Sequence, residues 1–120
     1  MTTTKMLGLA LGAALFAVPF AASADDAPSA FNACKACHKV EAGKNGVGPS
    51  LAGVFGRKAG SAPGFKYSDA MAAAGAWDEA ALGKYLADPK GAIPGNKMAF
   101  AGLKKPEDVA AVVAYLKTVK

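Results

Sequence analysis

The sequence has few of the side chains that bind metals. It contains two cysteines and one histidine in 120 residues, and they lie together as Cys34, Cys37 and His38. A structural zinc site takes four ligands, and no second cluster lies nearby. A disulfide between the cysteines would close a two-residue loop and add little stability. Thioredoxin-like chemistry is typical of a βαβ context, of which the sequence gives no sign. These three uses of the cysteines are therefore disfavoured.

Long apolar runs are absent after the first two dozen residues. Lys5 precedes a continuous apolar run over residues 6–18, and small residues at Ala22 and Ala24 match a signal-peptidase site. The run is shorter than the roughly 20 residues that span a bilayer, and no cysteine at the cut could carry a lipid. We expect residues 1–24 to be a signal peptide cleaved after Ala24. Residues 25–120 would then form one exported domain without a membrane span.

The expected domain is poor in bulky aliphatic side chains and rich in alanine and glycine. Because small domains bury little core for each residue, a large apolar cofactor could help to fill the interior. Without Lys5 the domain has 13 basic and 9 acidic residues, a formal charge of +4. No basic run is interleaved with aromatic residues, so nucleic acid is not an expected partner. The charge fits simple solubility or an acidic protein partner.

Helical patterns predict an all-α domain. Asp78 is placed to cap one helix, and Pro106 begins another, in which three valines and Leu116 form a single apolar stripe. The predicted segments are residues 28–37, residues 79–87, the C-terminal stretch from Pro106 and, more weakly, residues 68–74.

The chain between these helices is predicted to be loop, including the stretch after Pro89. Residues 40–64 are rich in glycine and show no sustained alternation, so no strand is predicted there. Long loops in a compact domain usually serve a function. Wrapping a cofactor is such a function.

Cys34-Lys35-Ala36-Cys37-His38 has the C-x-x-C-H pattern of covalent haem attachment. Two cysteines at this spacing can form thioethers with two neighbouring vinyl groups on one haem edge. The next residue is then carried beneath the macrocycle, where its imidazole can meet the iron. We predict one covalent haem c on Cys34 and Cys37, with His38 as an iron ligand.

The residue that provides the second iron ligand decides whether the haem transfers electrons or binds small molecules. There is no second histidine, and after residue 24 only Met71 and Met98 offer a thioether. Met71 lies in an alanine-rich helical stretch and is expected to fill core. Met98 lies in a loop with Pro94 and Gly95, which can aim a side chain inward. With both positions filled, electron transfer is favoured over binding of small molecules.

The C-x-x-C-H pattern alone leaves two other classes of haem protein open. A peroxidase would need a distal acid–base residue such as a second histidine, and none is present, so we expect no enzymatic activity. A redox subunit bound permanently to one enzyme would need a sizeable exposed apolar patch. That alternative stays open at the level of the sequence.

The chain resembles class I monohaem cytochromes c, the mitochondrial type and related small bacterial proteins, from about Phe31 to the C-terminus. The motifs that carry the resemblance are CKACH, GVGPSLAGVFGRKAGSAPGFKYSDA, Trp77, DPKGAIPGNKMAFAGLKK and the closing helix with AYLK. The resemblance implies a small cytochrome c fold with three main helices, a short one, and long loops wrapped around one haem. It also implies that His38 and Met98 are the two iron ligands.

The resemblance further implies roles for residues around the haem. The carbonyl of Pro49 would accept a hydrogen bond from the His38 ring, which orients it. Tyr85 would lie beside the sulfur of Met98. The residues similar to those that surround the haem propionates are Arg57, Tyr67 and Trp77 for the buried one and Asn96 for the other.

The function implied is that of a soluble, monomeric, periplasmic one-electron carrier. Its partners would be a cytochrome bc-type reductase and a terminal oxidase or photosynthetic reaction centre. Lysines around the exposed haem edge would dock on acidic patches of these proteins. These lysines are Lys35, Lys39, Lys90, Lys97, Lys104 and Lys105.

Overall fold

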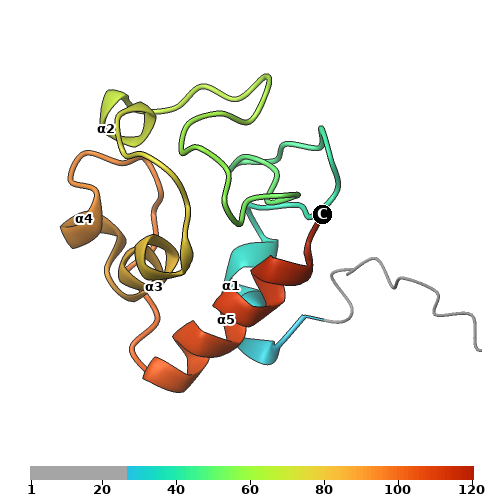
Figure 1. The fold of residues 1–120 in the computed structure, drawn as a ribbon, viewed down its shortest axis with the longest axis vertical. Helices are drawn as coiled ribbons and strands as arrows, with labels where there is room; N and C mark the ends of the chain where they lie inside the picture. Colours follow the sequence, from blue (N-terminus) through green and yellow to red (C-terminus); the bar gives the residue numbers. More distant parts are fainter. Residues whose placement is uncertain (1–26) are drawn as a thin grey trace, which may run out of the picture.

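The computed structural model describes residues 27–120, which form helices joined by long loops (Figure 1). The predicted signal peptide and its cleavage site lie outside the described residues. Within residues 27–120 no strand occurs, and an isolated antiparallel bridge pairs Lys58 with Ala76. The all-α prediction is confirmed. No helix in this part of the chain is long and apolar enough to cross a membrane.

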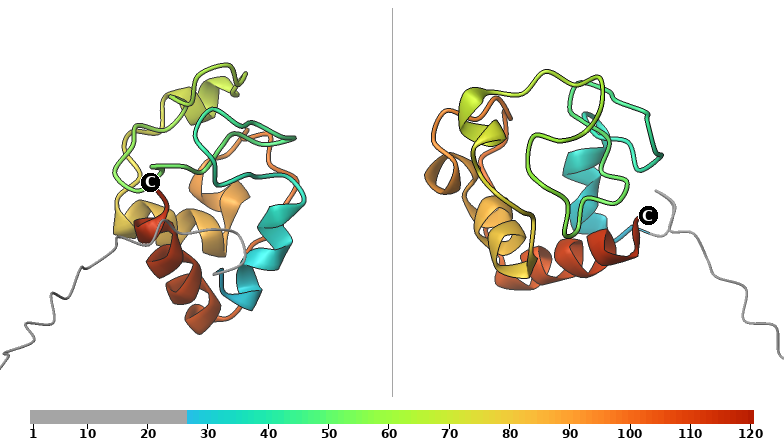
Figure 2. Two further views of the ribbon diagram at one scale, coloured as in Figure 1. Left: turned by 90° about the vertical axis from the view of Figure 1, so that its right-hand side faces the viewer. Right: turned by 45° about the horizontal axis from the view of Figure 1, so that its top comes forward.

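The C-terminal helix α5 (Pro106–Thr118) crosses the N-terminal 3-10 turn η2 (Ser29–Phe31), as both views in Figure 2 show. The ring of Phe31 packs edge-on against that of Tyr115, with centroids 4.9 Å apart. Val112 and Leu116, from the predicted apolar stripe, are also buried. This crossing joins the two ends of the domain in one core.

Two consecutive helices, α3 (Glu79–Ala87) and α4 (Pro89–Ala92), pack against one another, and α3 also packs on α5. The prediction for α3 is confirmed, including its cap, since Asp78 accepts a hydrogen bond from the amide of Ala81 at 2.8 Å. The prediction of loop after Pro89 is wrong for one turn. Asp88 ends α3 and also caps α4, accepting from the amide of Gly91, with Pro89 in its first turn.

The remaining helices are shorter than predicted. The segment predicted as residues 28–37 forms η2 followed by α1 (Asn32–Lys35). The α-helix ends early because its last turn is tightened: the amides of Cys37 and His38 both donate to the carbonyl of Cys34. The weak prediction at residues 68–74 corresponds to α2 (Asp69–Ala72).

The long loops are held by their own hydrogen bonds. The side chain of Asn45 donates to the carbonyl of Pro63 and accepts from the amide of Ser50, both at 2.9 Å. Further along, the amide of Trp77 donates to the carbonyl of Arg57 at 2.8 Å. Bonded in this way, the segment from α1 to α2 arches above α3 and α5 (Figure 2, right). Loops and helices together enclose the candidate site.

Candidate haem-binding site

A cavity of about 250 Å³ lies between the helices and the long loops. Its walls are mostly apolar and include Leu82, Val112 and Leu116 from α3 and α5. Nearly all of the site residues that the sequence suggested line it, although they come from segments far apart in the chain. These residues are Cys34, Cys37, His38, Pro49, Arg57, Tyr67, Trp77, Tyr85 and Met98.

His38 is held in one orientation at the end of α1. Its ring Nδ1 lies 2.8 Å from the carbonyl oxygen of Pro49, which is the contact that the resemblance implies. Burial lowers the pKa of His38, and the hydrogen bond to Pro49 partly opposes this effect. A neutral imidazole that donates through Nδ1 keeps the lone pair of Nε2 for a metal.

Gly48 completes the support of His38, and sequence reasoning missed it. A Cβ on Gly48 would stand 2.5 Å from Cε1 and 2.8 Å from Nδ1 of the ring. The amide of Gly48 donates to the carbonyl of Cys37 at 2.8 Å, so the loop backbone is pinned beside the C-x-x-C-H segment. A glycine immediately before Pro49 was the signal that could have indicated this close approach.

Cys34 and Cys37 are free and partly buried at the cavity wall. Burial raises the pKa of the Cys34 thiol, and the neighbouring Cys37 raises it further. Because the two sulfurs are not joined to one another, both are available for thioether bonds.

Met98 lies beside Tyr85 in the same cavity. The Tyr85 hydroxyl donates to Sδ of Met98 at 3.8 Å. Burial raises the pKa of Tyr85 to about 12, so the phenol stays protonated and able to donate at neutral pH. The ring of Trp77 packs on that of Tyr85, with centroids 5.0 Å apart, which fixes the phenol beside the sulfur.

Asn96 does not line the cavity. Its amide donates to the carbonyls of Pro89 and Ile93, both at 2.9 Å, and its side-chain oxygen accepts from the amide of Met98 at 2.8 Å. These bonds brace the loop that carries Met98. They also engage both N–H groups of the Asn96 amide with backbone carbonyls.

Arg57 provides a test of whether the cavity suits a haem. Its two terminal nitrogens donate to the carbonyls of Ala52 and Ser50 at 3.0 and 3.1 Å. Its Nε is buried and has no hydrogen-bond partner among the described residues. A buried cationic donor is costly when it lacks a partner, and a propionate carboxylate would supply one.

Other features of the cavity agree with this test. The hydroxyl of Tyr67 accepts from the amide of Ala62 at 3.1 Å, which leaves its own proton free for an acceptor. Met71, which the sequence assigned to the core, is partly buried and lines the cavity. Two thiols, an oriented imidazole, a thioether, apolar walls and an unpaired buried donor together suit haem c.

An all-α domain with these groups around one apolar cavity defines a small monohaem protein. The sequence matches the model of the cytochrome c family over residues 24–120. It is 74% identical to cytochrome c2 iso-2 of Magnetospirillum fulvum over 95 residues, which are 78% of this chain and 99% of that protein. It is 67% identical to cytochrome c2 of Rhodoplanes tepidamans over 97 residues, 79% of this chain and 99% of that protein.

A solved structure is also similar. Cytochrome cH from Methylobacterium extorquens superposes with a TM-score of 0.69 at 53% identity, over 74% of this chain and 91% of that one. The chain therefore belongs to the cytochrome c family. It is a small electron carrier with one covalent haem c and not an enzyme.

Proposed function

We propose that the protein is a soluble, monomeric, periplasmic one-electron carrier with His38 and Met98 as the two iron ligands. Residues 25–120 would be its mature form, after cleavage at Ala24. The observation that carries the proposal is that one cavity contains an imidazole oriented by Pro49 and a thioether contacted by Tyr85. Two preoriented ligands would hold the iron from both sides, which would limit reorganisation during electron transfer.

The bound haem supplies the one-electron redox couple, and the chain supplies its surroundings. Cys34 and Cys37 would hold one haem edge. The carbonyl of Pro49 would fix the tautomer of His38, and the Nε–H of Arg57, which has no other partner among the described residues, would pair with a propionate. The mostly apolar walls would favour the less charged, reduced iron and so a high potential.

The proposed partners are a bc-type reductase as donor, and a terminal oxidase or reaction centre as acceptor. All of the lysines that the sequence assigned to a docking face are exposed, and Lys97 also lines the cavity. The expected net charge of +4 after removal of Lys5 suits acidic partner surfaces.

The ferric absorption spectrum at neutral pH tests the ligation. The wild-type protein should show the weak red methionine-to-iron charge-transfer band, and Met98→Ala should lose it. Met71→Leu is the matched control and should keep the band, because Met71 is not the proposed ligand. A high-spin wild-type spectrum, or a band that survives in Met98→Ala, would contradict the proposed pair of iron ligands. It would also contradict an electron carrier in which the protein fills both ligand positions of the iron.

A further inference from the structure

The segment that carries Met98 is one loop between α4 and α5 (Figure 1), and its far end is fixed to the end of α3. The amide of Leu103 donates to the carbonyl of Leu86 at 2.7 Å. Gly102, with a φ of +108°, lies so close to α3 that a Cβ there would overlap the carbonyl oxygen of Ala87. This end of the loop has little room to move, so any movement of Met98 has to come from the span that follows α4.

The side chain of Asn96 is the main polar support of that span. Within residues 27–120, the backbone amides from Lys97 to Gly102 make a single hydrogen bond, from Met98 to the side-chain oxygen of Asn96 at 2.8 Å. The side-chain nitrogen of Asn96 donates to the carbonyls of Pro89 and Ile93, at the two ends of α4, both at 2.9 Å. One half-buried amide group therefore ties the backbone of Met98 to α4.

These contacts bear on access to the iron on the side of Met98. A small ligand can reach the metal there only after the sulfur has moved away, and that movement shifts the backbone amide that Asn96 holds. The contact of the Tyr85 hydroxyl with the sulfur is 3.8 Å long, and a thioether is a weak acceptor. The bonds of Asn96 therefore stabilise the closed loop relative to the open one. Because only open molecules bind the ligand, these bonds lower its apparent affinity.

We propose that Asn96 is a positioning residue that holds Met98 against the iron and thereby keeps small nitrogen ligands such as imidazole away from the metal. The proposal rests on the proposed ligation by Met98 and adds the group that controls its release. It differs from the role that the family resemblance implied, a donor to a haem propionate, because both N–H groups of the amide are used on backbone carbonyls. A brace on the backbone acts alike in both oxidation states.

The test measures the binding of imidazole to the ferric, haem-loaded protein, followed by the loss of the methionine-to-iron charge-transfer band. Asn96→Ala removes all three bonds, and we expect the dissociation constant of imidazole to fall about tenfold. Before imidazole is added, the variant should show the band, because the sulfur still reaches the iron. Its midpoint potential should match the wild type, whereas the loss of a propionate donor would shift it.

Asp78→Ala is the control for a general loss of stability, because it removes the cap of α3 outside the Met98 loop. It should lower the urea midpoint and leave the dissociation constant of imidazole at the wild-type value.

Three outcomes would overturn the role of Asn96 while leaving ligation by Met98 intact. They are an unchanged dissociation constant in Asn96→Ala, an equal fall in Asp78→Ala, and a shifted midpoint potential in Asn96→Ala. A wild-type protein without the charge-transfer band would instead contradict ligation by Met98 itself.

Discussion

Gly48 lies against the imidazole of His38 with no space for a side chain between them. A Cβ there would meet Cε1 at 2.5 Å, and the bond from Gly48 to Cys37 keeps the loop from moving away. We predict that Gly48→Ala displaces the ring from Pro49 and destabilises the holoprotein by about 1–3 kcal/mol. Thermal unfolding and the Soret spectrum measure the two effects.

Gly83 in α3 is the matched control for this substitution. A Cβ at Gly83 would meet nothing within 4 Å, and alanine is favoured over glycine inside a helix by roughly 0.5–1 kcal/mol. Gly83→Ala should therefore leave the spectrum unchanged and raise stability slightly. If Gly48→Ala behaved in the same way, packing against Gly48 would not be what holds His38.

Met71 brings a further apolar side chain to the haem cavity. Apolar surroundings disfavour the oxidised iron, which carries one more positive charge. We predict that Met71→Asn lowers the midpoint potential, by roughly 60 mV if the amide stabilises the ferric state by about 1.4 kcal/mol. A spectroelectrochemical titration measures the shift, with Met71→Leu as the apolar control. An unchanged or higher midpoint in Met71→Asn would contradict this account.

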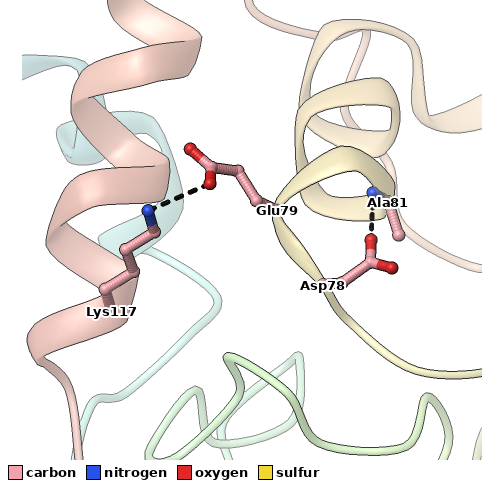
Figure 3. A network of polar contacts seen from close by, with 4 residues as sticks. All are labelled: Asp78, Glu79, Ala81 and Lys117. Atoms are coloured by element: carbon pink, nitrogen blue, oxygen red, sulfur yellow. Dashed lines mark hydrogen bonds and ion pairs between the residues drawn. The ribbon is translucent and has the colours of Figure 1, made fainter.

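At the scale of elements, the first turn of α3 has two polar contacts of different strength (Figure 3). Asp78 caps the helix through the amide of Ala81 at 2.8 Å. Glu79 pairs with Lys117 of α5 at 3.2 Å, and these side chains are 70% and 41% exposed. We predict that Asp78→Ala costs about 1 kcal/mol of stability and that Glu79→Gln costs about half as much or less.

Salt distinguishes the two contacts in urea-unfolding measurements. The loss in Glu79→Gln should shrink towards zero at high NaCl, because the pair lies in solvent and is screened. The loss in Asp78→Ala should persist, because it comes mainly from an unsatisfied helix amide. Equal salt dependence in the two variants would show that the cap acts through charge alone.

The same helix shows what local sequence patterns can predict. Asp78, the residues of α3 and the stop at Asp88 are contiguous, so the bounds of α3 followed from the sequence. The turn of α4 was missed because Asp88 and Pro89 signal a helix start as well as a stop. The predicted end of α1 was wrong because the carbonyl of Cys34 accepts hydrogen bonds from two backbone amides in a tightened turn. No side-chain pattern reveals such a turn.

At the scale of the whole molecule, the site depends on contacts that no local pattern contains. The C-x-x-C-H motif and the family resemblance pointed to site residues that, with the exception of Asn96, all line the cavity. They did not indicate that Gly48 lies against His38, or that the side-chain amide of Asn96 donates to two backbone carbonyls, those of Pro89 and Ile93. These features arise only when loops far apart in the chain close around one volume.

That volume leads to a prediction for the protein without haem. Without haem, the apolar walls of this cavity would lose the buried contacts that help to stabilise the fold. The total stability of a small domain is only about 5–15 kcal/mol, so we expect this loss to be a large part of it. We predict that the double variant Cys34→Ala, Cys37→Ala, which cannot attach haem covalently, loses most of its helical circular dichroism and its cooperative urea transition. Added free haem should restore part of both, because His38 and Met98 remain. A haem-free variant with the helicity and urea midpoint of the holoprotein would show that α3, α5 and the loops hold the cavity open unaided.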